Sequence, residues 1–269
     1  MKAIKKFTKS FENTLDKPDD RVKELRIKAF EEFVKVGIPN RKNEFWKFSD
    51  PSIILKLNLE FNETTTKIDE DYDIILCNGK IVKCRTNCKT GSISEGIING
   101  NIDENALETK ENPFLNLNNA FAINGCYLVL DKNSENNIRI LNLINNNGKQ
   151  QAVYPRIIIV AEKNSNTTIF EEFRVTGNGS NFVNSVMNIS LDSGANLEHI
   201  IMDDYANDTY HISNVYAKQK KDSNFISHNF SIGKRFARRD FNIELAGTGA
   251  NCDLNGVYFA SKEEHIDHH

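Results

Sequence analysis

The sequence has no long apolar run and almost no net charge. No stretch approaches the 18 or so consecutive apolar residues that a membrane helix needs, so no membrane contact is expected. Lys and Arg number 34 against 37 Asp and Glu, and the net charge of −3 is too small and of the wrong sign for a nucleic-acid-binding surface along the whole chain. Basic residues near Met1 are followed by no apolar segment, so we predict no secretory signal.

Cysteine is scarce as well, with five residues at irregular spacing. An odd number in a chain of this length does not suggest a disulfide framework, and a reducing cytoplasm is the expected location. The closest three, Cys77, Cys84 and Cys88, match no common zinc spacing, so we favour unrelated thiols over a metal site. Cys252 follows a turn and is expected to act as a small buried apolar residue.

Nucleotide-binding loops are missing too. The segment from Gly247 to Gly249 lacks the third glycine of a dinucleotide loop, and Ile97 stands where a P-loop would need lysine. The last seven residues contain His265 and His268, which could be metal ligands, but we assign them no role. The sequence therefore predicts no catalytic, cofactor-binding or metal-binding residue, and any ATPase site that drives the protein's work would belong to another subunit.

The N-terminal part reads as helical. Apolar residues recur at helical spacing over residues 4–15 and again over residues 22–33. Pro18 separates the two predicted helices, and Gly37 is a typical residue to end the second. We assign residues 1–57 to a helical N-terminal region.

The next part, residues 58–125, has a mixed α/β pattern and is assigned as a connecting region. The dipeptide Asn78-Gly79 lies between two short apolar runs and predicts a β-hairpin. Residues 112–123 predict a helix that carries three large apolar side chains.

Residues 126–269 change to a β pattern that repeats. A small residue followed by Asn recurs at intervals of 30, 28 and 27 residues, with an apolar or alternating strand before and after each pair. A propeller blade needs about 40 residues, so a stacked β-helix fits these shorter units better. The Asn and Gly residues between the strands suit the left-handed backbone of a sharp corner. The four pairs are Ser165-Asn166, Ala195-Asn196, Ser223-Asn224 and Ala250-Asn251.

Charged clusters offer little chemistry. Asp203-Asp204 follows a strand, and because neighbouring side chains of a strand point to opposite faces, at most one carboxylate could face a cleft. We favour solvated turn residues there. For the basic clusters at residues 218–221 and 234–239, a solvated face is favoured over a docking patch for an acidic partner.

Three stretches resemble the SufB/SufD family of iron–sulfur cluster assembly proteins, and within it the SufD branch. Residues 36–50, Val-Gly-Ile-Pro-Asn-Arg-Lys-Asn-Glu-Phe-Trp-Lys-Phe-Ser-Asp, are similar to the family's N-terminal signature around Trp46. Residues 117–125, Leu-Asn-Asn-Ala-Phe-Ala-Ile-Asn-Gly, resemble the motif that leads into its β-region. The repeats resemble its rungs, from Pro155-Arg156 onward.

This resemblance implies a right-handed parallel β-helix after a small helical region. It implies a cytoplasmic scaffold subunit of the SufBCD complex, not an enzyme by itself, with a SufB-like subunit and a SufC-like ATPase as partners. The Fe–S cluster would be assembled at the level of the complex, with no cofactor assigned to this chain.

Family members continue past the point that matches His269, with further rungs and a helical segment that engages SufC. We therefore expect the chain to be an N-terminal fragment whose β-helix is incomplete at its C-terminal end. Two alternative functions stay open. One is a β-helical carbohydrate-active enzyme, and the other is a plain interaction module that uses the basic cluster at residues 234–239.

Overall fold

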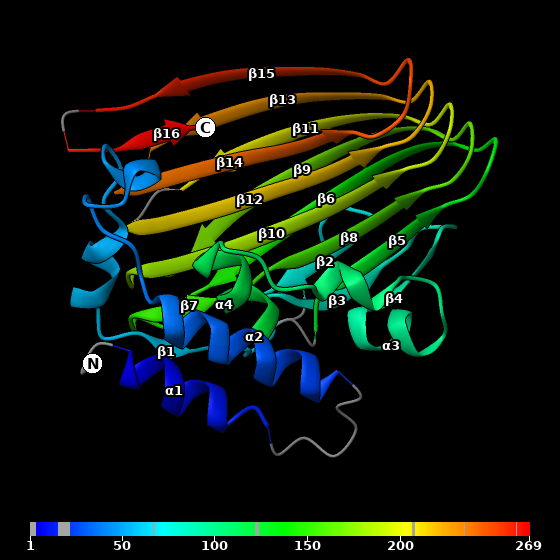
Figure 1. Ribbon diagram of the computed structural model, residues 1–269. Helices are drawn as coiled ribbons and strands as arrows, with labels where there is room; N and C mark the ends of the chain where they lie inside the picture. Colours follow the sequence, from blue (N-terminus) through cyan, green and yellow to red (C-terminus); the bar gives the residue numbers. More distant parts are fainter. Residues whose placement is uncertain are drawn as a thin grey trace.

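In the computed structural model, most of the chain is a solenoid of parallel strands with a layer of helices on one side (Figure 1). The mainly β fold and the stacked β-helix predicted from the repeats are confirmed, with about five turns. Among the described residues, no helix is both long and apolar enough to span a membrane. The structure describes residues 4–15, 22–66, 68–121, 124–205, 208–233, 235–261 and 263–269.

The chain alternates between two sheets that face each other across the solenoid interior. Neighbouring strands within each sheet are parallel, except where β3 and β4 turn back at the N-terminal end of the solenoid. Sheet A is ordered β16 (Ile266–His268), β14 (Phe236–Leu245), β12 (Thr209–Gln219), β10 (Asn181–Leu191), β8 (Arg156–Ala161), β5 (Cys126–Leu130) and β4 (Lys89–Ser92), with β7 (Gln151–Val153) and β1 (Glu60–Phe61) joined beside β10. Sheet B is ordered β15 (Asn251–Phe259), β13 (Asn224–Ile232), β11 (Asn196–Asp204), β9 (Asn166–Thr176), β6 (Glu135–Asn145), β2 (Ile74–Cys77) and β3 (Lys80–Cys84).

The sequence repeat coincides with the strand register of sheet B. The asparagines of the four pairs begin β9, β11, β13 and β15 and are direct partners between neighbouring strands. The residue before each pair has a positive φ, which Asn, Asp and Gly adopt at little cost. The small residue then turns into the interior, as Ser165 and Ala195, both fully buried, illustrate. The four positive-φ residues are Asn164, Gly194, Asp222 and Gly249.

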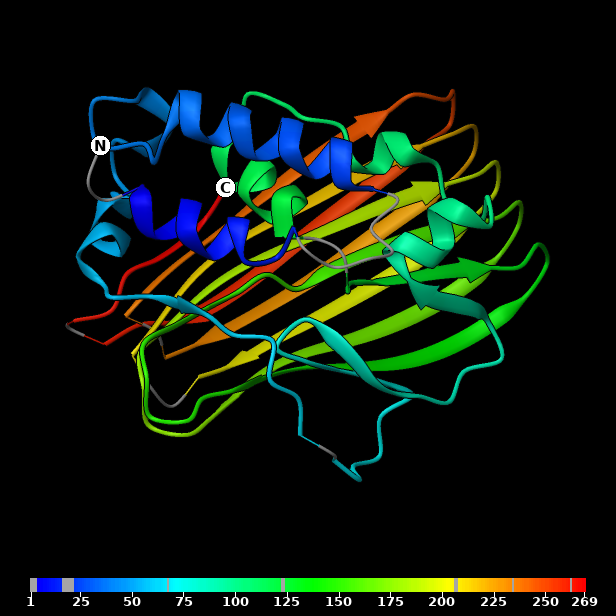
Figure 2. The ribbon, with the colours of Figure 1, turned by 90° about the horizontal axis from the view of Figure 1, so that it is seen from below.

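The N-terminal helices form as the apolar spacing predicts, and they cover the outer face of sheet A (Figure 2). Helix α4 lies against β10, and α2 packs on α4. Gly37, with φ 72°, ends α2 as expected, whereas Pro18 lies outside the described residues. The helices are α1 (Lys5–Glu12), α2 (Lys23–Val36), α3 (Ile93–Ile98) and α4 (Pro113–Phe121), with the 3-10 helices η1 (Glu44–Trp46), η2 (Pro51–Lys56) and η3 (Glu104–Leu107).

The two local predictions in the connecting region hold. Strands β2 and β3 form an antiparallel hairpin, and Asn78 and Gly79 at its turn have φ 48° and 83°. The helix predicted over residues 112–123 is α4, although residues 122–123 lie outside the described residues. Strand β2 also pairs in parallel with β6, so this hairpin ends sheet B at the N-terminal side.

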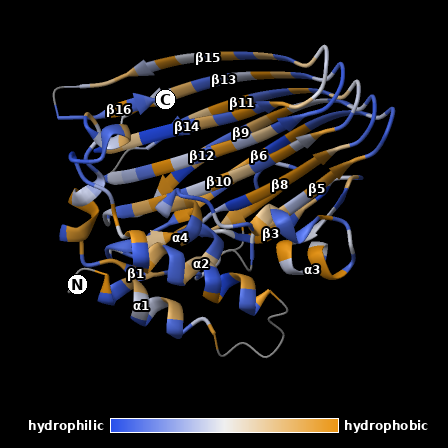
Figure 3. Ribbon diagram, in the orientation of Figure 1, coloured by the Kyte–Doolittle hydropathy of each residue, from blue (hydrophilic) through white to orange (hydrophobic). Residues whose placement is uncertain are grey.

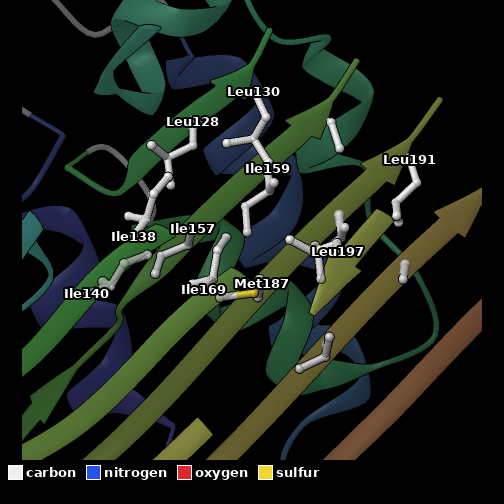
Figure 4. Packing of buried hydrophobic residues seen from close by; sticks show 14 of the residues in the cluster. Leu128, Leu130, Ile138, Ile140, Ile157, Ile159, Ile169, Met187, Leu191 and Leu197 are labelled. Atoms are coloured by element: carbon white, nitrogen blue, oxygen red, sulfur yellow. The ribbon is translucent and has the colours of Figure 1, made fainter. Parts of the chain in front are cut away.

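Two apolar clusters hold the layers together. Inside the solenoid, inward side chains of both sheets interdigitate, among them Leu128, Ile157 and Met187 (Figure 4). Outside it, aromatic rings such as Phe114 and Phe182 join α4 to sheet A. Figure 3 shows apolar residues alternating with polar ones along the strands, as a strand with two different faces requires. Each fully buried side chain of this size contributes about 1.5–3 kcal/mol.

Candidate functional site

The interior of the solenoid is apolar at the turns of β5 and β8 and polar toward β14. Strand alternation turns Leu197, His199, Ile201 and Asp203 of β11 inward, because these residues occupy every second position. His199 is 0% and Asp203 is 1% exposed. Buried titratable groups are costly unless they are paired, so the contacts of these side chains define the candidate site.

Asp203 meets an arginine of the opposite sheet. Arg239 on β14 reaches across the interior, and its Nη2 lies 3.0 Å from Oδ1 of Asp203. The same guanidinium donates from Nε to Ser213 Oγ at 3.2 Å and from Nη1 to the side chain of Asn229. Ser231 Oγ donates to Oδ2 of Asp203 at 3.0 Å. The ion pair is thus hydrogen-bonded on both sides, which offsets the cost of burying two charges.

His211 forms a second centre of the network. Its Nε2 lies 2.7 Å from Ser185 Oγ, and its Nδ1 lies 3.1 Å from the hydroxyl of Tyr205. Burial raises the pKa of Tyr205 well above its ordinary value, and the nearby Asp203 adds to the effect. Tyr205 therefore keeps its proton, and its hydroxyl can donate a hydrogen bond to Nδ1; with that tautomer, the N–H at Nε2 donates to Ser185.

Glu171 and His199 form a third centre. The two side chains come from the adjacent strands β9 and β11, with Nε2 of His199 3.0 Å from Oε2 of Glu171. Asn142 on β6 donates to the other oxygen of Glu171 at 2.7 Å. A cavity of about 10 Å³ lies beside Glu171, Ser185 and Ser213, which is room for a single water-sized group.

The network ends at a partly exposed histidine. His268 of β16 lies 3.1 Å from both Asn229 and Ser231 through its Nε2, and its ring meets that of Tyr258 edge-on. His268 is therefore the link between the interior side chains and the surface. The available chemistry is hydrogen bonding and ion pairing among buried groups, since the exposed fractions of the Asp203, Arg239 and His199 side chains are 4% or less.

A second polar cluster joins the tryptophan segment to the last strands. The guanidinium of Arg238 lies 4.3 Å from the ring centre of Trp46 and donates from Nη1 to the backbone oxygen of Phe45 at 2.5 Å. It also pairs with Asp240 at 2.8 Å and with Asp267 at 3.1 Å. This cluster stabilises the contact between residues 45–49 and sheet A.

His265 belongs to the same cluster. Ser49 Oγ lies 2.8 Å from His265 Nε2 and donates to Asp267. Ser49 is 1% exposed, so its hydroxyl links the segment of residues 45–49 to the last strands and is not accessible to a substrate. His265 and His268, which the sequence left without a role, thus contact different polar clusters.

Two surface assignments made from the sequence are wrong. Asp203 is an interior ion-pair partner rather than a solvated turn residue, although Asp204 is exposed as alternation requires. In the basic cluster at residues 234–239, Arg238 and Arg239 are 4% and 3% exposed, while Lys234 lies outside the described residues. The lysines of residues 218–221 are exposed, as predicted. These two assignments failed because charged side chains were assumed to face solvent.

The cysteines do not converge on a metal site. Among the described residues, no group of three or more His, Cys, Asp or Glu side chains could hold a metal ion. Cys77 is buried, Cys84 is exposed and Cys88 is half-buried. Cys252, expected to be buried, is half-buried; it packs against the solenoid core, and its burial raises its pKa.

The sequence reasoning missed Glu171, His199, His211 and Tyr205 as buried polar side chains of the solenoid interior. A usable signal existed for His199, because it alternates with Leu197 and Ile201, which a β-helix must turn inward. The pairing of these residues with partners on other strands depends on how the turns stack, and a single sequence does not show that.

The fold and its interior define a class: a parallel β-solenoid that carries a buried polar network and a helical layer on one sheet. Residues 143–269 match the family described as SUF system FeS cluster assembly, SufBD core domain. The matched segment runs from the end of β6 through every later turn of the solenoid. The match supports a relationship between this part of the chain and the SufB/SufD family. A comparison with curated proteins gave no significant match.

Proposed function

We propose that this chain is a SufD-type scaffold subunit of a cytoplasmic complex that assembles iron–sulfur clusters, and that it is not an enzyme by itself. The observation that carries the proposal is the agreement between the SufBD core-domain match and the solenoid turns that contain the polar network. A SufB-like subunit and a SufC-like ATPase are the proposed partners. The cluster is then assembled by the complex and not on this chain alone.

Strand β15 offers a surface for such a partner. Among the described strands it pairs only with β13, so its other edge presents free backbone groups. Leu254, Tyr258 and Phe259 on this strand are 47%, 56% and 65% exposed. A further coil or a strand of a partner subunit can extend a sheet at an edge of this kind.

The test is copurification of the full chain with SufB-like and SufC-like proteins from the same source, followed by size-exclusion chromatography. We expect one complex that contains this chain and the SufB-like subunit. Leu254→Glu places a charge on the apolar edge and should remove the SufB-like subunit from the complex. Val34→Glu, at a 43% exposed position of α2, is the matched control and should leave the complex intact. Equal retention of the partners by both variants would contradict the use of this edge.

The two alternative functions are less well supported. For a carbohydrate-active enzyme the sequence offered Asp203, and this carboxylate is paired with Arg239 inside the solenoid. An interaction module would use the basic cluster, of which Arg235 alone among its described arginines is exposed, and it pairs with Glu263 at 2.7 Å. Reversing all three arginine charges would disturb the fold through Arg238 and Arg239, so that change cannot test a surface role.

A further inference from the structure

The cavity of about 10 Å³ beside Glu171 lies between the two sheets of the solenoid. Glu171 belongs to β9 of sheet B, whereas Ser185 and Ser213 belong to β10 and β12 of sheet A. The two serines are direct partners in the pairing of β10 with β12, so they lie side by side. Polar groups therefore face the cavity from both sheets. The rest of the lining is apolar and includes Ile157, Phe173, Met187, Ile201 and Val215.

Glu171 has acceptor capacity that its described neighbours do not use. The two oxygens of a carboxylate together offer about four lone-pair sites. Oε1 accepts from Asn142 at 2.7 Å, and Oε2 lies 3.0 Å from Nε2 of His199. Glu171 is 4% exposed, so bulk solvent does not supply the other hydrogen bonds. Sites for a further donor therefore remain on this carboxylate.

Both serine hydroxyls also have unused hydrogen-bonding capacity, since a hydroxyl can donate one hydrogen bond and accept two. Ser213 Oγ accepts from Nε of Arg239 at 3.2 Å, which leaves its own O–H as a donor. Ser185 Oγ lies 2.7 Å from Nε2 of His211 and keeps a free site whichever of the two atoms donates. Among the described contacts, neither serine bonds directly to Glu171.

The size of the cavity and these unused sites fit a single water molecule. A volume of about 10 Å³ is near the smallest that holds a water, and a buried water typically makes about three hydrogen bonds. A water here can accept from Ser213, donate to Glu171 and form a third hydrogen bond with Ser185. Water reaches such enclosed sites during brief local openings of the fold.

The surroundings disfavour an ion in the same place. A Ca²⁺ or Mg²⁺ ion takes about six or more oxygen ligands, whereas three polar side chains line the cavity among the described residues. The guanidinium of Arg239, which donates to Ser213, repels any cation at this point. The carboxylate of Glu171 repels an anion in turn. A neutral molecule that both donates and accepts hydrogen bonds satisfies all three side chains.

We propose that this cavity is a binding site for one ordered water molecule, which bridges Glu171 of sheet B to Ser185 and Ser213 of sheet A. The water joins the three polar centres of the interior into one network. A continuous series of hydrogen bonds then runs from β6 to β16. The bridge links the two sheets in addition to the Asp203–Arg239 pair. The site lies inside the solenoid, so it holds or fails independently of the assembly function proposed above.

The first test is a crystal structure of the full chain at a resolution that shows ordered waters. We expect an isolated density peak at about 2.6–3.2 Å from the Glu171 carboxylate and from the hydroxyls of Ser185 and Ser213. Crystals soaked in rubidium or bromide salts distinguish an ion, because both elements scatter anomalously, and we expect no anomalous peak at this position. An empty cavity or an anomalous peak there would overturn the proposal.

The second test displaces the water without removing any of its partners. Val215→Ile adds one methyl group beside the cavity, and because the core around it is close-packed, the cavity is where this group fits. Water magnetic relaxation dispersion should count one fewer long-lived water than in wild type. The melting temperature should fall, because Glu171 and the serines lose a hydrogen-bonding partner.

Val257→Ile, at a 47% exposed position of β15, is the matched control and should change neither quantity. If Val215→Ile kept the wild-type number of long-lived waters, the water would lie elsewhere. A higher melting temperature of Val215→Ile would show that the added methyl group fills a dry cavity. Either result would overturn the proposal.

Discussion

Asp203 of β11 and Arg239 of β14 form an ion pair of 3.0 Å across the interior of the solenoid. The pair joins sheet B to sheet A, and both side chains are almost completely buried. A low-dielectric interior increases the attraction between the two charges.

Asp203→Ala should lower the free energy of unfolding by about 3–5 kcal/mol, because Arg239 would stay buried without its counter-charge. Urea denaturation followed by circular dichroism measures the change. Lys149→Ala is the control, since it breaks an ion pair with Glu60 whose side chains are 72% and 63% exposed. That substitution should lower the free energy of unfolding by about 0–1 kcal/mol. Similar losses in the two variants would contradict a buried pair.

Arg156 connects α4 and η3 to sheet A. It is fully buried and donates to Asn118 Oδ1 at 3.2 Å, Asn119 Oδ1 at 2.8 Å and the backbone oxygen of Ala106 at 2.5 Å. Burial lowers the pKa of Arg156 to about 9, with no carboxylate among these partners. The guanidinium therefore holds two helical segments by three hydrogen bonds to uncharged acceptors.

Arg156→Lys should lower the free energy of unfolding by about 1–3 kcal/mol, because an ammonium group cannot reach all three acceptors. Hydrogen exchange should accelerate in residues 104–107 and 113–121 more than in the solenoid strands. Arg85→Lys, at a 70% exposed side chain, is the control and should change neither quantity. Unchanged hydrogen exchange in α4 of Arg156→Lys would contradict this role of Arg156.

Thiol reactivity should differ sharply between cysteines. Burial raises the pKa of Cys126 to about 12, with a weaker opposing effect of its hydrogen bond with Thr90, so its thiolate is scarce at pH 8. Cys84 is exposed. Ellman's reagent should label Cys84 quickly in the native protein and reach Cys126 only on unfolding. Cys84→Ser should remove the fast phase, and a fast phase that persists in this variant would refute the assignment.

Asp192 should contribute a pH-dependent term to stability. The backbone N–H of Ser193 donates to its Oδ1 at 2.7 Å and lowers its pKa, and Lys220 at 3.3 Å adds to the effect. In acid the unfolded chain then binds a proton more readily than the folded chain does. The stabilisation by Asp192 is therefore complete above the ordinary value of 3.8 and is lost as pH falls through the lower folded value.

Asp192→Asn tests the direction of this pH dependence of stability. The difference in unfolding free energy between wild type and variant should be constant at neutral pH and shrink as pH falls below about 3.8. Glu31→Gln on α2 controls for loss of a surface charge. A difference that grows in acid would contradict the prediction.

The repeat could be found in the sequence because every turn of the solenoid requires the same backbone conformation and a small side chain at its corner. Asn166, Asn196 and Asn224 follow a buried small residue and a positive-φ residue, and these requirements act over three neighbouring positions. The same holds for the end of α2 at Gly37 and for the hairpin turn at Asn78-Gly79. Such signals are local, so they can be identified without knowing the rest of the fold.

The polar network could not be found in this way. Arg238 and Arg239 are adjacent in sequence, yet alternation sends Arg238 under Trp46 on the outer face and Arg239 into the interior. Arg238 pairs with Asp240 on its own strand and with Asp267, whereas the partner of Arg239 is Asp203 on another turn, 36 residues earlier. A charged residue was therefore assigned to water because its compensating group was many residues away.

The sequence by itself determined the succession of helices and strands, the corner positions and the register of sheet B, since each depends on backbone preferences and on a short period of burial. Tertiary structure alone decided which polar side chains meet. Ser49 reaches Asp267, 218 residues further along the chain, and Asp203 reaches Arg239 over 36. These contacts exist because successive turns stack and the N-terminal segment folds back on the last strands, which places distant residues at hydrogen-bonding distance.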